Sequence, residues 1–313
     1  MKSRASIIAL AISLTVLVVV GFQLDWHGVM AAWARVVWPW VVAVAIVNIA
    51  NSWVEGLRWR SVLGASDINV TPRTAFSAML VGTVGNVVLP FKLGEAARAW
   101  GMARLTRAPM STIASTVVLD RLLDVAALTL LLLVAPLVAG PIGMKFPSAR
   151  VIAIGLAVTA VVLALLVLGW KRMQAHRGSG GRFTPQMDAF VKGLAMLRQH
   201  HILARGLALA LASWFTRVAV VWLMFFAFGL DWSPLRGFLT LLAINLSIVV
   251  IGTPGNVGTF ELAGAGALRL FGAPPEVAVS YAVALHLAEV VPTVLLGAFA
   301  IWKLGIRLER PEE

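Results

Sequence analysis

The stretch Gly85-Asn-Val-Val-Leu-Pro90-Phe-Lys92-Leu-Gly94-Glu95-Ala-Ala-Arg98 interrupts an apolar segment and places three charged side chains directly behind the break. Because proline has no backbone N–H and disfavours helical backbone at the preceding residue, we expect a helix to end here. A segment in lipid must pair its backbone polar groups internally, and broken backbone is tolerated at membrane depth only where protein or water surrounds it. The stretch therefore predicts a buried polar site, not a lipid-facing span.

A second break, Gly252-Thr-Pro254-Gly255-Asn256-Val257-Gly258-Thr-Phe-Glu261, interrupts another apolar segment in the C-terminal half of the chain. In both breaks a proline is followed four residues later by a glycine, and a glutamate lies close behind. We therefore expect two helical hairpins whose polar tips meet inside the protein.

Composition places the chain in the membrane class. Of its 313 residues 60% are hydrophobic and only 13% are charged, and the mean hydropathy is +0.90. Soluble domains carry about 25% charged residues. The net charge of +12 falls mainly between apolar segments, where basic residues set orientation, so it does not indicate nucleic-acid binding. Without cysteines the chain has no disulfide, thiolate nucleophile or Cys-ligated metal.

The pattern predicts an all-α, polytopic helical membrane protein with about six full spans and two re-entrant helical hairpins. A span needs about 20 apolar residues. The expected spans are residues 5–21, 36–54, 111–134, 151–170, 206–228 and 277–302, and the broken segments are 74–90, 235–251 and 258–270.

Charge between the segments tests the re-entrant interpretation. If both broken segments leave the bilayer on the side from which they entered, both termini and residues 55–73, 92–107 and 171–205 face the cytoplasm. These regions hold most of the 26 Lys and Arg residues, as the positive-inside rule requires. Treating both breaks as full crossings would move 92–107 and 171–205 outside. We therefore expect a multi-pass protein of the cell (inner) membrane with both termini cytoplasmic.

The same pattern indicates an internal repeat within one transmembrane domain, residues 1–313. One half covers about 5–140 and the other about 150–305, and each contains two spans, a broken hairpin and a span with a polar pair. The halves run in opposite directions, which is the architecture of secondary transporters. Between them, the basic loop 171–205 is either a solvated connector or contains an amphipathic helix on the bilayer surface.

Ionisable side chains inside the spans are the candidates for a buried polar path. A charge at the bilayer centre costs ~2.5–3.5 kcal/mol, so such groups must pair or face a polar cavity. Asp120 and Asp124 share a helix face, as do His286 and Glu289, whereas Arg121 points about 100° away from the first pair. Two interpretations stay open: ion pairs that lock helices together, or a path that carries charge balance or protons. The candidates are Asp120, Arg121, Asp124, Arg217, His286 and Glu289.

Residues at the two breaks are the candidates for substrate binding. Glu95 and Arg98 share a face at a helix start, which favours anions, and arginine can bind phosphate bidentately. A phosphate-bearing headgroup entering from the inner leaflet would meet this pair. Orientation alone accounts for Lys92, and asparagine at a break either caps a half-helix or contacts substrate. The candidates are Asn86, Pro90, Lys92, Gly94, Glu95, Arg98, Asn256 and Glu261.

We expect no metal, no cofactor and no enzyme activity. His286 and Glu289 have a spacing found in metal sites of helix bundles, but His286 is the one histidine inside an expected span. The chain shows neither a nucleophile elbow nor a phosphate-binding loop. An intramembrane enzyme acting on lipid phosphate nevertheless stays open as an alternative, and it would require the carboxylates to hold a metal.

Read in order, these motifs resemble the flippase-like family, also called the lysylphosphatidylglycerol synthase transmembrane region family. The resemblance covers roughly residues 5–305 and rests on Asn86…Pro90-x-x-x-Gly94-Glu95-x-x-Arg98, Asp120-Arg121-x-x-Asp124, Arg217 and Pro254-Gly255-Asn256-Val257-Gly258-Thr-Phe-Glu261. It implies an inner-membrane protein that moves lipids such as aminoacylated phosphatidylglycerol between leaflets. Other stand-alone members are associated with polyprenyl-linked sugar or hopanoid pathways.

Two departures from the family pattern matter. The usual Pro-Gly-Gly-x-Gly has asparagine at its third position here, Asn256, which bears on backbone flexibility at that turn. The cytoplasmic aminoacyl-transferase domain of bifunctional members is absent from this chain, so we expect it not to make lysyl-lipid itself.

The function that we expect is transport of an amphipathic lipid, anionic or of a polyprenyl or aminoacyl type, between leaflets. Glu95 and Arg98 would engage the headgroup from inside, and Glu261 would act near the outer mouth. The expected partners are the lipid and enzymes of lipid or glycan biosynthesis, with no nucleic acid. A scaffold or accessory subunit of a lipid- or glycan-modifying pathway stays open as the alternative.

Overall fold

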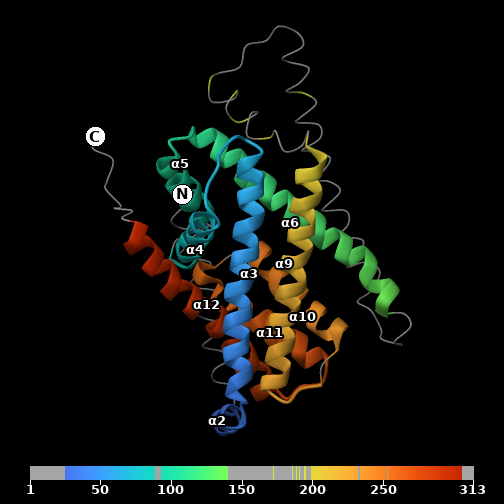
Figure 1. The fold of residues 1–313 in the computed structure, drawn as a ribbon. Helices are drawn as coiled ribbons and strands as arrows, with labels where there is room; N and C mark the ends of the chain where they lie inside the picture. The colour runs from blue at the N-terminus through green and yellow to red at the C-terminus, as the bar shows by residue number, and fades with distance from the viewer. Residues whose placement is uncertain are drawn as a thin grey trace. The chain divides into compact units, whose positions relative to one another are not determined.

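A computed structural model describes residues 25–88, 93–139, 199–231, 233–251 and 253–304, with single positions at 172, 185, 188, 190 and 194. Within this part of the chain the regular elements are nine α-helices and one short 3-10 helix (Figure 1), so the all-α prediction is confirmed. They are α2 (Trp26–Ala34), α3 (Trp38–Gly64), α4 (Pro72–Val88), α5 (Gly94–Thr106), α6 (Met110–Ala139), α9 (His200–Ala227), α10 (Pro234–Ile251), η4 (Pro254–Asn256), α11 (Thr259–Leu270) and α12 (Pro275–Leu304).

Three of the described helices are long and apolar enough to cross a bilayer: Trp38–Gly64, His200–Ala227 and Pro275–Trp302. They confirm the polytopic membrane class and correspond to the spans expected at 36–54, 206–228 and 277–302. The span expected at 111–134 lies within α6, a helix of 30 residues. The spans expected at 5–21 and 151–170, and most of the basic loop 171–205, lie outside the described residues. The inverted repeat therefore stays a prediction.

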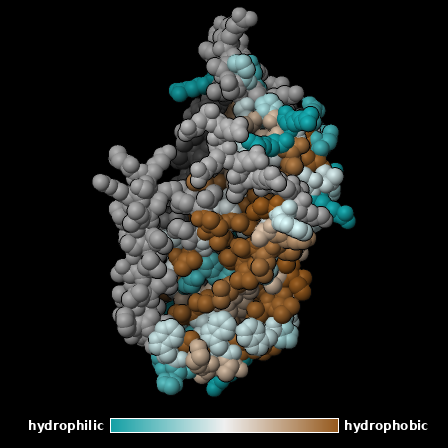
Figure 2. Space-filling model, turned by 90° about the vertical axis from the view of Figure 1, so that its left-hand side faces the viewer, coloured by the Kyte–Doolittle hydropathy of each residue, from teal (hydrophilic) through white to brown (hydrophobic). Residues whose placement is uncertain are grey.

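Helix α12 shows why such a helix belongs in lipid. Its large exposed side chains recur at a spacing of four residues and then three, which places them on one helix face. Figure 2 shows hydrophobic side chains covering a broad area of one face of the molecule, with hydrophilic side chains below and above it. Such a surface is stable in hydrocarbon and is unfavourable in water. The exposed stripe of α12 is Leu287, Val291, Leu295, Phe299 and Trp302.

Both predicted helix breaks are present. Helix α4 ends at Val88 and α5 begins at Gly94, while α10 ends at Ile251 and α11 begins at Thr259 after the 3-10 turn η4. The two glycines of the first hairpin allow its helices to approach closely, since a Cβ on Gly85 would lie 2.6 Å from the Cα of Gly94. Pro90 and Lys92 lie outside the described residues.

The second break uses left-handed backbone. Gly255, Asn256 and Gly258 have φ angles of 59°, 58° and 84°. This conformation costs a residue with a side chain about 1–2 kcal/mol, and asparagine is among the few that adopt it routinely. The asparagine in place of the usual second glycine is thus compatible with the left-handed backbone of the turn.

Substitutions at Asn256 test this backbone requirement. We expect Asn256→Gly to keep or raise the melting temperature of the detergent-solubilised protein, because glycine adopts positive φ at no steric cost. Asn256→Val is expected to lower the stability by about 1–2 kcal/mol or more, since a β-branched residue is a genuine outlier at positive φ. If the valine and glycine variants have the same melting temperature, the turn does not require positive φ at position 256.

The chain divides into two compact units. Unit 1 contains residues 1–56, 73–101 and 215–313, and unit 2 contains 57–72 and 102–214. Helices α3, α5 and α9 each begin in one unit and end in the other.

Helix α3 differs from the expectation at its C-terminal end. We expected the second span to end at Val54, with residues 55–73 as a cytoplasmic loop, but the helix continues to Gly64. The helix end was placed too early because Glu55 and Arg58 look like a polar boundary in a hydropathy profile, whereas the cytoplasmic position of residues 55–73 stays a prediction. In the structure both are buried and ion-paired, so they do not require the helix to end.

Candidate functional site

Unit 1 contains a cavity of about 240 Å³ to which both helix breaks contribute. Asn86 reaches it from the end of α4, and Asn256 reaches it from η4. The two breaks lie against each other, since a Cβ on Gly255 would be 3.6 Å from the backbone oxygen of Val87. The expectation that the tips of the two hairpins meet therefore agrees with the geometry of this unit.

The wall of this cavity is rich in side chains that can hydrogen-bond. Its polar members are amides (Asn48, Asn51, Asn86, Asn245 and Asn256), hydroxyls (Ser52, Thr83 and Thr293) and ionisable groups (Glu55, Arg217, His286 and Glu289). Burying a polar group without a partner is unfavourable by several kcal/mol in the most apolar surroundings. Their convergence in an apolar chain indicates a place for a polar ligand.

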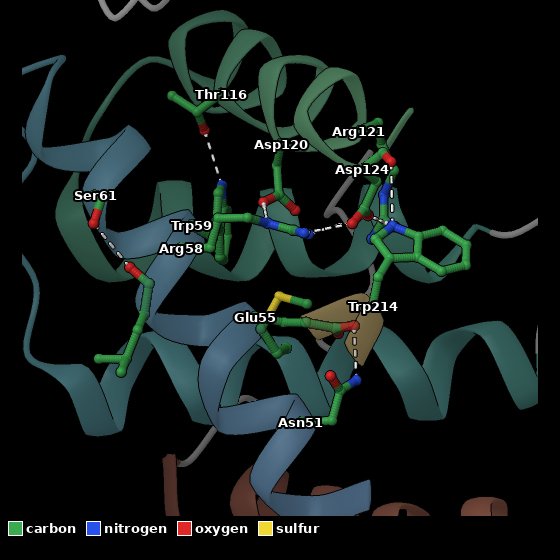
Figure 3. Close-up of polar contacts among 12 residues, drawn as sticks. Asn51, Glu55, Arg58, Trp59, Ser61, Thr116, Asp120, Arg121, Asp124 and Trp214 are labelled. Carbon is green, nitrogen blue, oxygen red and sulfur yellow. Dashed lines mark hydrogen bonds and ion pairs between the residues drawn. The ribbon is translucent and has the colours of Figure 1, made fainter. Parts of the chain in front are cut away.

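One side of the cavity holds an ion pair between α3 and α9. A side-chain nitrogen of Arg217, Nη2, contacts Oε1 of Glu55, and the Nδ2 group of Asn51 donates to the same oxygen at 3.0 Å (Figure 3). Arg217 was predicted to lie in the polar path, whereas Glu55 was missed. A signal was available, because Asn48, Asn51, Ser52 and Glu55 recur at helical spacing along one face.

The cavity wall also holds a histidine, His286, whose ring is fixed by a glutamate. Nδ1 of His286 lies 2.6 Å from Oε1 of Glu261, and Oε2 of Glu261 accepts a 2.7 Å hydrogen bond from the backbone N–H of Gly258. Phe260 stacks on the imidazole at a centroid distance of 4.3 Å. Glu261 was expected near the outer mouth, and its pairing with His286 could not be read from the sequence.

This arrangement determines which ring nitrogen of His286 carries the proton and which one accepts hydrogen bonds. A carboxylate only accepts hydrogen bonds, so Nδ1 carries the proton that Glu261 binds, and in the neutral ring Nε2 is an acceptor. The side chain is 8% exposed, and Nε2 has no hydrogen-bond partner among the described residues. Buried polar groups are normally paired, so the unpaired nitrogen indicates that a ligand binds near His286.

Glu289 lies on the same helix face as His286 and also lines the cavity. Its backbone oxygen accepts hydrogen bonds from Nδ2 of Asn48 at 2.9 Å and from Oγ1 of Thr293 at 2.6 Å. Pro292 lies within the helix at this level and removes one backbone donor. Within the described part of the chain, no hydrogen bond or ion pair involves the carboxylate of Glu289.

Asp120, Arg121 and Asp124 belong to a separate cluster in unit 2, centred on Arg58 (Figure 3). Nε of Arg58 lies 2.7 Å from Oδ1 of Asp120, and the side chains of both residues are fully buried. Nη1 and Nη2 of Arg58 contact the carboxylate of Asp124. The shared face of the two aspartates is confirmed, and here the helix-locking interpretation fits the geometry. Arg58 was missed as a site residue because the second span was expected to end at Val54.

Arg121 joins this cluster from outside. Its Nη1 lies 2.9 Å from Oδ2 of Asp124, although the side chain is 42% exposed. The residue was expected to point away from the face that Asp124 shares with Asp120, but its long side chain reaches the carboxylate three positions further along. The indole Nε1 of Trp214 also donates to the backbone oxygen of Asp124 at 3.2 Å.

Glu95 and Arg98 form the expected i, i+3 pair at the start of α5, with Nη2 of Arg98 2.7 Å from Oε2 of Glu95. Arg98 is 1% exposed and packs towards α4, where Nη1 contacts Sδ of Met79 at 2.6 Å. Its side chain passes over Gly82 of the same helix. Arg98 thus joins the two helices of the first hairpin, and its binding of a headgroup stays a prediction.

Comparison with protein families agrees with this geometry. Residues 6–297 match the family described as lysylphosphatidylglycerol synthase TM region. The chain belongs to this family. The resemblance inferred from the two breaks and the Asp-Arg-x-x-Asp motif is confirmed, and so is the multi-pass membrane class.

Three curated relatives are similar to the chain. Two are UPF0104 membrane proteins of Methanothermobacter thermautotrophicus. One is 26% identical over 66% of this chain and 68% of the relative. The other is 22% identical over 83% of this chain and 82% of the relative. The third is the glycosyltransferase AglD of Haloferax volcanii, 24% identical over 86% of this chain. That match covers 50% of AglD, so the other half of that protein has no counterpart in the alignment.

Proposed function

We propose that this family member moves an amphipathic lipid between the leaflets of the cell membrane, with the headgroup passing through the cavity of unit 1. The observation that supports this most directly is the cavity itself, where both helix breaks bring amides and ionisable groups together. The acyl chains stay in the surrounding hydrocarbon. On this proposal the hairpins are re-entrant, both termini are cytoplasmic, and the protein is not an enzyme.

The physical reason is the cost of moving a headgroup through hydrocarbon. Transfer of a hydroxyl or amide from water to cyclohexane, where no hydrogen bond is available, has a free-energy cost of about 4–8 kcal/mol. Side chains such as Asn48, Asn245 and Glu289 can replace the hydrogen bonds that water supplied. Helix α12 has the two faces that this requires, with His286 and Glu289 towards the cavity and an exposed apolar stripe around Val291.

The similarity to AglD favours a second candidate function. That relative is named a glycosyltransferase, and half of it matches this chain. A membrane unit that works beside a lipid- or glycan-modifying enzyme is therefore the alternative. It predicts that the purified protein does not move lipid by itself.

Lipid movement in reconstituted vesicles distinguishes these candidates. Phosphatidylglycerol with a nitrobenzoxadiazole-labelled acyl chain is bleached by external dithionite only in the outer leaflet, so movement appears as progressive loss of the protected signal. We expect faster loss with the protein than in empty vesicles, and a return to the empty-vesicle rate with Val290→Trp, which fills the cavity. Val291→Trp is the matched control, because its side chain is 46% exposed on the neighbouring face. Equal rates for the two variants would contradict passage through the cavity.

A further inference from the structure

We propose that the cavity selects a headgroup that donates hydrogen bonds, an ammonium or a hydroxyl, with the Glu289 carboxylate and Nε2 of His286 as the accepting atoms. This inference rests on the proposed function and names the chemistry of its substrate. It follows from which atoms of the cavity wall already have partners within the described part of the chain.

The charged groups that line the cavity are unequally satisfied. Arg217 is paired with Glu55. His286 is held by Glu261 through Nδ1. Glu289 is the lining acid whose carboxyl group has no salt-bridge contact among the described residues. A ligand that brings a cation or polar hydrogen atoms is therefore favoured there over one that brings further negative oxygens.

Two buried, unpaired side-chain atoms belong to residues that line the cavity, and both are acceptors. Nε2 of His286 and Oδ1 of Asn86 are both buried without a hydrogen-bond partner in the described part of the chain, and both residues line the cavity. Leaving a buried acceptor unpaired costs about 1–3 kcal/mol. A headgroup whose polar hydrogens pair with Nε2 of His286 and with the Glu289 carboxylate would remove part of this cost.

Glu261 has the role of a positioning residue. It does not line the cavity, but its two oxygens connect the start of α11 to the imidazole. It thereby fixes the proton on Nδ1 and leaves Nε2 as the acceptor of the neutral ring. Loss of its charge should change which headgroups are preferred, and not only how fast they move.

Three glycerophospholipids with the same labelled acyl chain separate donor chemistry from charge. Phosphatidylethanolamine donates through an ammonium and phosphatidylglycerol through hydroxyls. Phosphatidylcholine has the same phosphate and the same positive charge as the first but no N–H or O–H. We expect at least one of the two donors to move about tenfold faster than phosphatidylcholine, the effect of losing one hydrogen bond to a charged group.

The pattern of rates also identifies the donor. If only phosphatidylethanolamine moves fast, the preferred donor is an ammonium. If only phosphatidylglycerol moves fast, the preferred donor is a hydroxyl. If both move fast, the cavity accepts either kind of donor. Equal, protein-dependent movement of all three lipids would overturn this inference and leave the proposed function standing. No protein-dependent movement of any of them would overturn both.

Variants at Glu289 and Glu261 link the selectivity to these atoms. The quantity measured is the ratio of the faster donor's rate to the phosphatidylcholine rate, which does not change when a variant merely lowers the amount of folded protein. We expect Glu289→Gln and Glu261→Gln each to lower this ratio several-fold. Glu276→Gln, a matched control on the same helix outside the cavity wall, should leave it unchanged. An unchanged ratio in Glu289→Gln would contradict the assignment of the accepting carboxylate.

Discussion

Arg58→Ala is expected to destabilise the protein by about 3–5 kcal/mol, because it removes one partner of a buried ion-pair cluster and leaves uncompensated charge behind. Arg58 and Asp120 are both fully buried, with Nε and Oδ1 2.7 Å apart, and Asp124 depends on the same guanidinium. The variant should lose its folded, monodisperse peak in detergent at a lower temperature than the wild type, as followed by size-exclusion chromatography after heating.

Arg121→Ala is the matched control for this prediction. It removes an arginine from the same carboxylate of Asp124, but its side chain is 42% exposed and Arg58 remains to pair the aspartate. Exposed ion pairs contribute about 0–1 kcal/mol, so the melting temperature should change little. If both variants melt together, the cluster around Arg58 does not stabilise unit 2 in the way that its burial indicates.

Gly94→Ala is expected to damage both stability and lipid movement. A Cβ on Gly94 would overlap the backbone oxygen of Gly82 and lie 2.5 Å from the backbone nitrogen of Asn86. Overpacking a core costs about 1–3 kcal/mol when side chains can adjust, and here the obstructing atoms are backbone. Helices α4 and α5 must therefore separate, and Asn86, which lines the cavity, moves with them. The measurements are the melting temperature in detergent and the rate of labelled-lipid movement in vesicles.

A second glycine supplies the comparison. Gly266 lies in helix α11 of the same unit, and a Cβ built there has no neighbour within 4 Å. Gly266→Ala should therefore be neutral or stabilise by up to about 1 kcal/mol, since alanine is the better helix former. A Gly94→Ala protein as stable and as active as Gly266→Ala would show that the first hairpin does not need its close helix contact.

Sequence patterns located the helix breaks well because proline and glycine act on the local backbone. The expected segments 235–251, 258–270 and 277–302 agree with α10, α11 and α12 to within two residues at each end. At the second break Pro254 removes a backbone donor, and Gly255 and Gly258 adopt positive φ, both of which are local backbone effects. The shared faces of Asp120 with Asp124 and of His286 with Glu289 also follow from helical spacing alone.

Partners between helices could not be predicted in the same way. One sequence shows which residues share a helix face but not which faces meet, so the pairs Arg58–Asp120, Glu55–Arg217 and Glu261–His286 appeared only in the structure. Glu55 and Arg58 were also not predicted as site residues, because a hydropathy profile places the end of a span at a charged residue. In lipid a charge that has a buried partner can lie within a helix.

Because the chain contains no cysteine, a single introduced thiol tests passage through the cavity most directly. Val290→Cys places it on the cavity wall, and Val291→Cys places it on the neighbouring exposed face. Lipid movement is measured before and after treatment with a water-soluble, cationic methanethiosulfonate. We expect modification of Val290→Cys to reduce movement to the rate of empty vesicles and treatment of Val291→Cys to leave it unchanged. Undiminished movement through a fully modified Val290→Cys protein would show that headgroups do not pass through this cavity.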